Sequence, residues 1–204
     1  LIVTNENIDS INSKWPNLKT HVFLNEACIF TSPISNIKKG EKYTIYIPSK
    51  NSNYSVYFSE LPIVSINTDK TIIDETNVLA NFKMVESNQN LIESFIGIQY
   101  RGAYSQSLPK KSMEIEFWTD NTGVNKKDYS LLGMTTTDGW NLQAMYNEPL
   151  RIRSKTNNDL WRMINTLHYK DKEPNALNGI IMKYVELFLN NEYRGLYCLG
   201  EKVN

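Results

Sequence analysis

Residues 95–118, FIGIQYRGAYSQSLPKKSMEIEFW, contain two stretches of alternating apolar residues on either side of a polar loop. Side chains of a β-strand point to its two faces in turn, so this alternation predicts two strands joined by the loop 101–110. The residues expected on the apolar faces are Ile96, Ile98 and Tyr100 in the first strand and Lys111, Met113, Ile115 and Phe117 in the second.

Lys111 is the unusual member of this set, because it begins the apolar face of the second strand. A lysine on an apolar face costs free energy unless a carboxylate, a carbonyl or a bound anion pairs with it, so a partner for its ammonium is expected. The alternative is that Lys111 lies at the strand end and extends its ammonium into water. Lys110, on the other face beside Ser112 and Glu114, is expected to be a solvated cross-strand partner.

The composition is that of a globular protein. The chain has 204 residues, 41% of them hydrophobic and 22% charged, which suffices for a sizeable core in one or two domains. Lysine plus arginine and aspartate plus glutamate both number 22, so no basic surplus indicates a nucleic acid as partner. No apolar run approaches the ~18 residues of a membrane span, and no signal peptide is present. The sequence begins with Leu1 rather than Met, so an N-terminal segment is expected to have been removed.

Two cysteines, Cys28 and Cys198, lie far apart in the sequence. They could form one long-loop disulfide, but independent burial as small core residues is the favoured interpretation.

Residues 1–60 are polar and β-prone, with short apolar runs separated by prolines, a glycine and an asparagine-rich cluster. This pattern predicts a small β-rich appendage.

Downstream, further strands are predicted at 79–85 and 138–145, and a short helical turn capped by Gly133 is predicted at 126–134. A hairpin is predicted at 182–202, with its turn at 190–192. The apolar residues of its first strand are Val185, Leu187 and Leu189.

The main helix is predicted at 150–167, after Pro149. The apolar stripe of this helix consists of Leu150, Leu160, Trp161, Ile164 and Leu167. Arg151, Arg153 and Lys155 place positive charge in the first turns, where the helix macrodipole disfavours it. These cations either serve something other than helix stability or form a solvated basic face.

The loop 101–110 combines serines, a glycine and lysines, which raises the hypothesis of phosphate binding. It lacks the order Gly-x-x-x-x-Gly-Lys-Ser/Thr of a Walker loop. By its pattern alone, a loop whose only glycine is Gly102 is more typical of an ordinary strand connection.

Four motifs in order make a more specific pattern: IGIQYRGAYSQSLPKKSMEIEFW, LLGM, DGWNLQAMYNEPLRIRS and VELFLNNEYRGLYCLGEKV. Together they resemble the spore-coat protein H (CotH) kinase-like family over about residues 61–203. The resemblance implies the small, nucleotide-side lobe of an atypical protein kinase, which uses ATP and a divalent metal such as Mg²⁺ to phosphorylate serines of coat proteins. A serine-rich protein is therefore the implied partner.

The resemblance also implies which residues bind the cofactor. These are Arg101, Ser105, Lys110, Lys111, Arg153, Glu148 and Glu201, while Trp140, Glu186, Gly195, Tyr197 and Lys202 match further motif positions. Two departures from the family pattern stand out. Asn147-Glu148 replaces Asn-Asp, and the turn reads Asn190-Asn191 instead of Asn-Gly, which asparagine tolerates because it accepts left-handed geometry. No catalytic residue or metal ligand is assigned, because no aspartate-rich constellation follows the final motif.

The expected fold is therefore α+β, a mostly antiparallel sheet with one main helix resembling a kinase small lobe, plus the appendage. The expected domains are residues 1–60 and 61–204, the second truncated before a catalytic lobe. The expected function is ATP-dependent phosphorylation of protein serines by the full-length parent, with this chain alone inactive. The alternative is a non-catalytic cell-surface or coat-associated binding module. A secreted or cell-surface location is expected in either case. Trp140 and Tyr197 are expected to fill the core between sheet and helix, and the alternative is that they stack on adenine.

Overall fold

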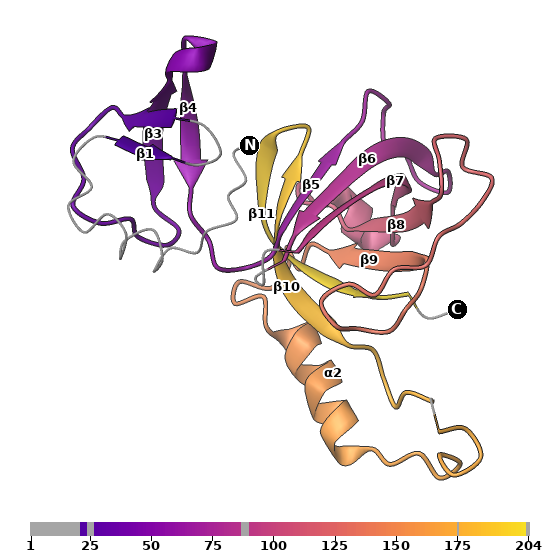
Figure 1. The fold of residues 1–204 in the computed structure, drawn as a ribbon. Coiled ribbons are helices and arrows are strands. Elements are labelled where there is room, and N and C mark those ends of the chain that lie inside the picture. The colour runs from indigo at the N-terminus through magenta and orange to yellow at the C-terminus, as the bar shows by residue number, and fades with distance from the viewer. Residues whose placement is uncertain (1–20, 24–26, 87–89, 175, 203–204) are drawn as a thin grey trace. The chain divides into compact units, whose positions relative to one another are not determined.

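The computed structural model divides the chain into two compact units (Figure 1). The structure describes residues 21–23, 27–86, 90–174 and 176–202. The N-terminal unit comprises Leu1–Ile63 and Val85–Leu91, and the barrel unit comprises Val64–Met84 and Ile92–Asn204.

The N-terminal unit contains an antiparallel sheet with the strand order β1-β2-β3-β4. Its elements are β1 His21–Phe23, β2 Ala27–Phe30, β3 Lys42–Ile47, the 3₁₀ turn η1 Pro48–Lys50 and β4 Ser52–Tyr57. Alternate residues of β3, Ile45 and Ile47, are fully buried and pack with Cys28, Phe30 and Val56. The sheet therefore has its own small core.

The barrel unit is a closed β-barrel with the strand order β10-β11-β9-β8-β7-β6-β5. Its strands are β5 Ile63–Asn67, β6 Val78–Val85, β7 Leu91–Tyr100, β8 Met113–Trp118, β9 Gly139–Gln143, β10 Met182–Leu189 and β11 Glu192–Glu201. The other elements are the 3₁₀ turn η2 Tyr104–Ser107 and the helix α2 Arg153–Ile164. A barrel of this strand number has an interior that side chains can fill.

The expected α+β fold resembling a kinase small lobe is wrong. The protein is mostly β, with 42% of residues in strands and 11% in helices, and its main sheet closes on itself. The physical reason is that inward-facing residues of every barrel strand share one core, which includes Val64, Phe82, Ile98, Phe117 and Leu187. A sheet closed around such a core needs no helix to cover it.

The opening strand pair is confirmed. β7 and β8 are antiparallel, with Ile98 opposite Ile115 and Tyr100 opposite Met113. The residues Ile96, Ile98, Met113, Ile115 and Phe117 are all at most 1% exposed and lie in the barrel core. Period-two alternation thus identified the inward faces correctly.

The closing hairpin is confirmed as well. β10 pairs with β11, and Val185, Leu187 and Leu189 belong to the core. The two turn residues Asn190 and Asn191 have φ values of 51° and 63°, the left-handed region that a two-residue hairpin turn requires. Asn191 therefore adopts the left-handed geometry that asparagine was expected to tolerate at this position.

The predicted helix is confirmed but is shorter than predicted, and its apolar stripe is exposed. Every residue of α2 is at least partly exposed, and Leu160, Trp161 and Ile164 are more than half exposed. One polar contact joins α2 to the barrel, because the Asn158 side-chain amide lies 3.4 Å from the sulfur of Met182 on β10. Helical periodicity predicted the helix but not which of its faces contacts the barrel.

The structure also tests the predictions for residues 126–134 and for the two cysteines. The helical turn predicted at 126–134 is wrong, because this segment forms isolated bridges, among them Tyr129 with Thr137, and a tight turn at 131–134. Cys28 and Cys198 are both buried, in two different core clusters, as the favoured interpretation of independent burial stated. In the part of the chain that the structure describes, no helix is long and apolar enough to cross a membrane.

Candidate functional site

Several predicted site residues lie at one end of the barrel. The antiparallel pairing brings the end of β7, the start of β8, the end of β9 and the start of β11 to this end. The connection 101–112 lies at this end of the barrel, and its residues line two hollows of about 290 and 270 Å³. Lys110 lines both of them. Barrel mouths are frequent ligand sites, so this end is the candidate functional site.

The larger hollow, called here the first cavity, brings together three of the predicted cofactor residues: Arg101, Ser105 and Lys110. Its other lining residues are Gly102, Tyr104, Leu108, Ser112, Gln143, Ala144, Met145, Tyr146, Asn147 and Ser154. Among the described residues, the lining thus carries two cations, three serine hydroxyls and two side-chain amides, and no carboxylate. Such a set of hydrogen-bond donors suits an anion.

The turn that shapes the first cavity depends on Gly102. Its φ is 85°, and a Cβ atom added there would lie 2.4 Å from Oγ of Ser105. The Ser105 hydroxyl in turn donates a hydrogen bond of 3.0 Å to the carbonyl oxygen of Arg101. The pair Arg101-Gly102 therefore requires glycine at its second position, both for backbone conformation and for space.

Lys110 is half-buried, so the prediction of a solvated side chain is wrong. Its ammonium donates a hydrogen bond to the carbonyl oxygen of Leu196 and lies 4.1 Å from the ring centre of Tyr197. Burial, followed by the charge of Arg151, lowers the pKa of Lys110 to about 8, and Glu186 opposes the shift. The cause of the error is that Lys110 precedes β8, where the alternation of strand faces does not apply.

Lys111 also precedes β8 and lies in the smaller hollow, called here the second hollow. Its ammonium is 5.0 Å from the ring centre of Tyr100. Among the described residues, the Lys111 ammonium therefore contacts an aromatic ring and not the expected carboxylate or carbonyl partner. The backbone of Lys111 is held from the other side, because the Tyr197 hydroxyl donates a 3.1 Å hydrogen bond to its carbonyl oxygen.

Glu148 and Arg153 lie outside both hollows, at the start of α2, where they line a third hollow of about 440 Å³. Oε1 of Glu148 accepts hydrogen bonds from the backbone amides of Ile152, at 2.8 Å, and Arg153, at 2.7 Å. The Glu148 side chain, 7% exposed, therefore caps the helix and supplies the negative charge that the basic first turns lack.

Glu201 lies near the opposite end of the barrel, where β11 pairs with the start of β9. Its carboxylate is 6% exposed and already accepts two backbone amides. Oε1 accepts from Thr135 at 2.8 Å, and Oε2 accepts from Ile181 at 3.0 Å. The structure does not bring Glu201 together with the other predicted cofactor residues.

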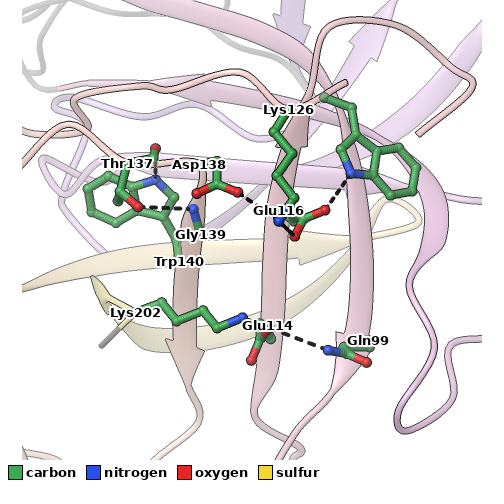
Figure 2. Close-up of polar contacts among 10 residues, drawn as sticks. Gln99, Glu114, Glu116, Lys126, Thr137, Asp138, Gly139, Trp140 and Lys202 are labelled. Atoms are coloured by element: carbon green, nitrogen blue, oxygen red, sulfur yellow. Dashed lines mark hydrogen bonds and ion pairs between the residues drawn. The ribbon is translucent and has the colours of Figure 1, made fainter. Parts of the chain in front are cut away.

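Figure 2 shows how two further cations, Lys126 and Lys202, are engaged by carboxylates on the outer face of the barrel. Lys202 lies 2.7 Å from Oε1 of Glu114, which also accepts from Gln99 (Figure 2). Lys126 bridges two carboxylates in the same view, at 2.7 Å from Glu116 and 3.2 Å from Asp138. These contacts link Glu114 and Glu116 of β8 to the segment that follows β8 and to the residue that follows β11.

Sequence reasoning missed Arg151 as a member of the site. Its charge is the second cause of the lowered Lys110 pKa, and its guanidinium donates a 3.0 Å hydrogen bond to the carbonyl of Ala144, a lining residue of the first cavity. The available signal was the unfavourable positive charge at the start of the helix. Ser112 and Ser154 were also missed, because nothing in their local sequence distinguishes them from other serines.

A model of the CotH kinase protein family matches residues 98–204, which is more than half of the chain. The chain therefore belongs to the CotH kinase protein family, as the four motifs indicated. The match includes the whole connection 101–112, α2 and the closing hairpin. A comparison with curated proteins finds none that matches the chain.

Proposed function

We propose that the chain is the nucleotide-binding part of a CotH-type protein kinase and that the first cavity takes the triphosphate of ATP. The observation that carries the proposal is the convergence of Arg101, Ser105 and Lys110 on one cavity, in which no described lining residue is a carboxylate. Triphosphates are recognised by such combinations of cations and hydroxyls. In the full kinase the acceptor would be a serine of a protein substrate.

The electrostatics of the cavity support this assignment. Two cations, Lys110 and Arg151, lie close enough for the charge of one to lower the pKa of the other. Two like charges that lie close together repel each other, which costs free energy. A bound polyanion would offset this repulsion. The partly buried setting of Lys110 strengthens this attraction, because fewer water molecules screen its charge.

The cavity does not fit a magnesium ion. Magnesium in ATP-dependent enzymes is bound through carboxylates together with substrate phosphates, and the lining of the first cavity has none. Among the described residues no group of three or more His, Cys, Asp or Glu side chains could hold a metal ion. The proposal therefore concerns phosphate binding by this chain, with no step in phosphoryl transfer assigned to it.

Lys110→Met is expected to weaken ATP binding by roughly tenfold or more. A charge-assisted hydrogen bond contributes about 1.5–3 kcal/mol, and about 1.4 kcal/mol corresponds to tenfold in affinity. Calorimetric titration of the 204-residue chain with ATP, with and without Mg²⁺, measures this effect. Magnesium is expected to add little to the affinity, and serine phosphorylation by this chain is expected not to exceed that of Lys110→Met.

Lys183→Met is the matched control. Lys183 is exposed on β10 and pairs with Leu199, toward the opposite end of the barrel. ATP affinity that is equal in the wild type and both variants would refute the proposed cavity. Undetectable ATP binding by the wild type would favour the alternative of a non-catalytic binding module.

The lowered pKa of Lys110 predicts a pH dependence of ATP binding. Above pH 7 the phosphates keep their charge, since their last pKa is about 6, so pH acts through the lysine. Its ammonium is charged below its pKa of about 8 and becomes neutral above it. The bound triphosphate favours the charged form, so the pKa in the complex is higher than in the free protein. ATP affinity should therefore begin to fall between pH 7 and 8, reach about half of its value at pH 7 near pH 8, where half of the lysine is neutral, and fall further above pH 8, by at most about tenfold per pH unit for one proton.

Lys110→Arg provides the test of this pH dependence. Arginine remains charged throughout the range, so the affinity of this variant should stay nearly constant from pH 7 to 9.5. Titrations in a series of buffers of equal ionic strength measure both proteins. Identical pH profiles of the wild type and Lys110→Arg would show that another group controls the binding.

A further inference from the structure

The second hollow is a different kind of site from the first cavity. It has a volume of about 270 Å³ and lies between the end of β7, the start of β8 and the hairpin β10–β11. Among the described residues, its lining contains three cations, Lys110, Lys111 and Arg194, and no carboxylate. Three tyrosines, Tyr100, Tyr193 and Tyr197, form half of the remaining lining residues.

The aromatic rings hold two of these cations in place. The Lys111 ammonium lies over Tyr100, and the Lys110 ammonium lies over Tyr197. A cation over an aromatic ring is stabilised without being neutralised, so it keeps its full charge for a further partner. The two ammonium groups are thus positioned at the hollow, and Lys111 has no hydrogen-bonded oxygen among the described residues.

Arg194 is the third cation and is paired with a neighbour on its own strand. Its guanidinium lies 2.7 Å from Oε2 of Glu192, and both side chains are more than 40% exposed. Exposed ion pairs of this kind contribute little to stability, so a better partner for the guanidinium can replace the carboxylate. A guanidinium binds phosphate oxygens through two parallel hydrogen bonds, which a single lysine cannot do.

We propose that the second hollow binds a phosphomonoester, the group carried by a phosphorylated side chain, with Lys111 and Arg194 as its principal ligands. A phosphomonoester carries up to two negative charges and three acceptor oxygens, which matches three surrounding cations better than a single carboxylate does. The volume of the hollow also suits a group as small as a phosphomonoester, because pockets for drug-sized ligands measure about 300–1,000 Å³ and this hollow is smaller. Lys111 and Arg194 do not line the first cavity, so the inference does not rest on the proposed ATP site.

The experiment uses the 204-residue chain in a phosphate-free buffer at pH 7. The probes are a short capped peptide with one phosphoserine, the same peptide with unmodified serine, and inorganic phosphate, each titrated by calorimetry. Phosphopeptide binding should weaken by roughly tenfold in Lys111→Gln and in Arg194→Gln. The affinity for the phosphopeptide should be unchanged in Arg101→Gln, which alters only the first cavity. It should also be unchanged in Lys183→Gln, which alters neither the first cavity nor the second hollow.

Each outcome decides the proposal. Phosphopeptide binding that requires Lys111 and Arg194, with no binding of the serine peptide, supports it. Inorganic phosphate that binds equally well through the same residues also supports it and identifies free phosphate as the source. Affinity for the phosphopeptide that is absent, or that survives both substitutions, overturns it. Because Arg194 is exposed, its substitution should not impair folding, and ATP titration of the same variants separates failure of this proposal from failure of the ATP site.

Discussion

Trp140→Ala is expected to lower the free energy of unfolding by roughly 3–5 kcal/mol, the range for truncating a buried large aromatic side chain. Trp140 is fully buried in the barrel core, where its strand neighbours are Ile115 on β8 and Glu201 on β11. Its Nε1 also donates a 3.2 Å hydrogen bond to the carbonyl oxygen of Thr137. The substitution therefore leaves a cavity and removes one of the two hydrogen bonds that the Thr137 carbonyl oxygen accepts, the other coming from the backbone amide of Tyr129.

Trp161→Ala is the matched control, because Trp161 lies on α2 with 53% of its surface exposed. Its substitution should cost less than about 1 kcal/mol, as expected for an exposed position. Urea unfolding followed by circular dichroism compares both variants with the wild type. A midpoint unchanged by Trp140→Ala, or shifted equally by both substitutions, would contradict the core assignment of Trp140.

Glu201→Ala is expected to lower the free energy of unfolding by about 3 kcal/mol. It removes the buried carboxylate that accepts the backbone amides of Thr135 and Ile181, and each hydrogen bond to a charged group contributes about 1.5–3 kcal/mol. These two amides belong to the segment before β9 and to the start of β10, so the carboxylate joins parts of the chain that are far apart in sequence. Glu201→Gln keeps one acceptor oxygen and should lose about half as much.

Glu93→Ala is the control for the loss of a carboxylate. Glu93 is 61% exposed and its Oε1 lies 2.9 Å from the ammonium of Lys83, an exposed pair that contributes at most about 1 kcal/mol. Urea unfolding measures all three variants. If Glu201→Ala unfolds like Glu93→Ala but loses ATP affinity, then Glu201 belongs to the cofactor site, as its motif position implied, and the structural role is wrong.

Local pattern predicted the strands of the barrel but not its closure. The alternation in 95–118 and 182–202 identified both hairpins and their inward faces, because strand periodicity is a property of neighbouring residues. Closure depends on β5 lying beside β10, more than a hundred residues later in the chain. Nothing in the sequence of either strand specifies that partner, so an open sheet covered by a helix was the natural expectation.

The candidate site was predicted in part, and the errors have one cause. Arg101, Ser105 and Lys110 do line one cavity, yet the roles expected of Lys110 and Lys111 were derived from strand faces. Both lysines precede β8, and the loop directs the Lys110 ammonium toward Leu196 of β11. Strand periodicity does not describe a loop, so side-chain direction there depends on tertiary contacts.

The proposed site at one end of the barrel is tested most directly by locating bound ATP on the chain. Backbone amide shifts recorded by NMR during an ATP titration report each residue separately. The account predicts large shifts in 101–110 and 143–147, around the first cavity, and unchanged amides at Thr135 and Ile181, which Glu201 holds near the opposite end. Shifts centred on Thr135 and Ile181, with 101–110 unchanged, would contradict it.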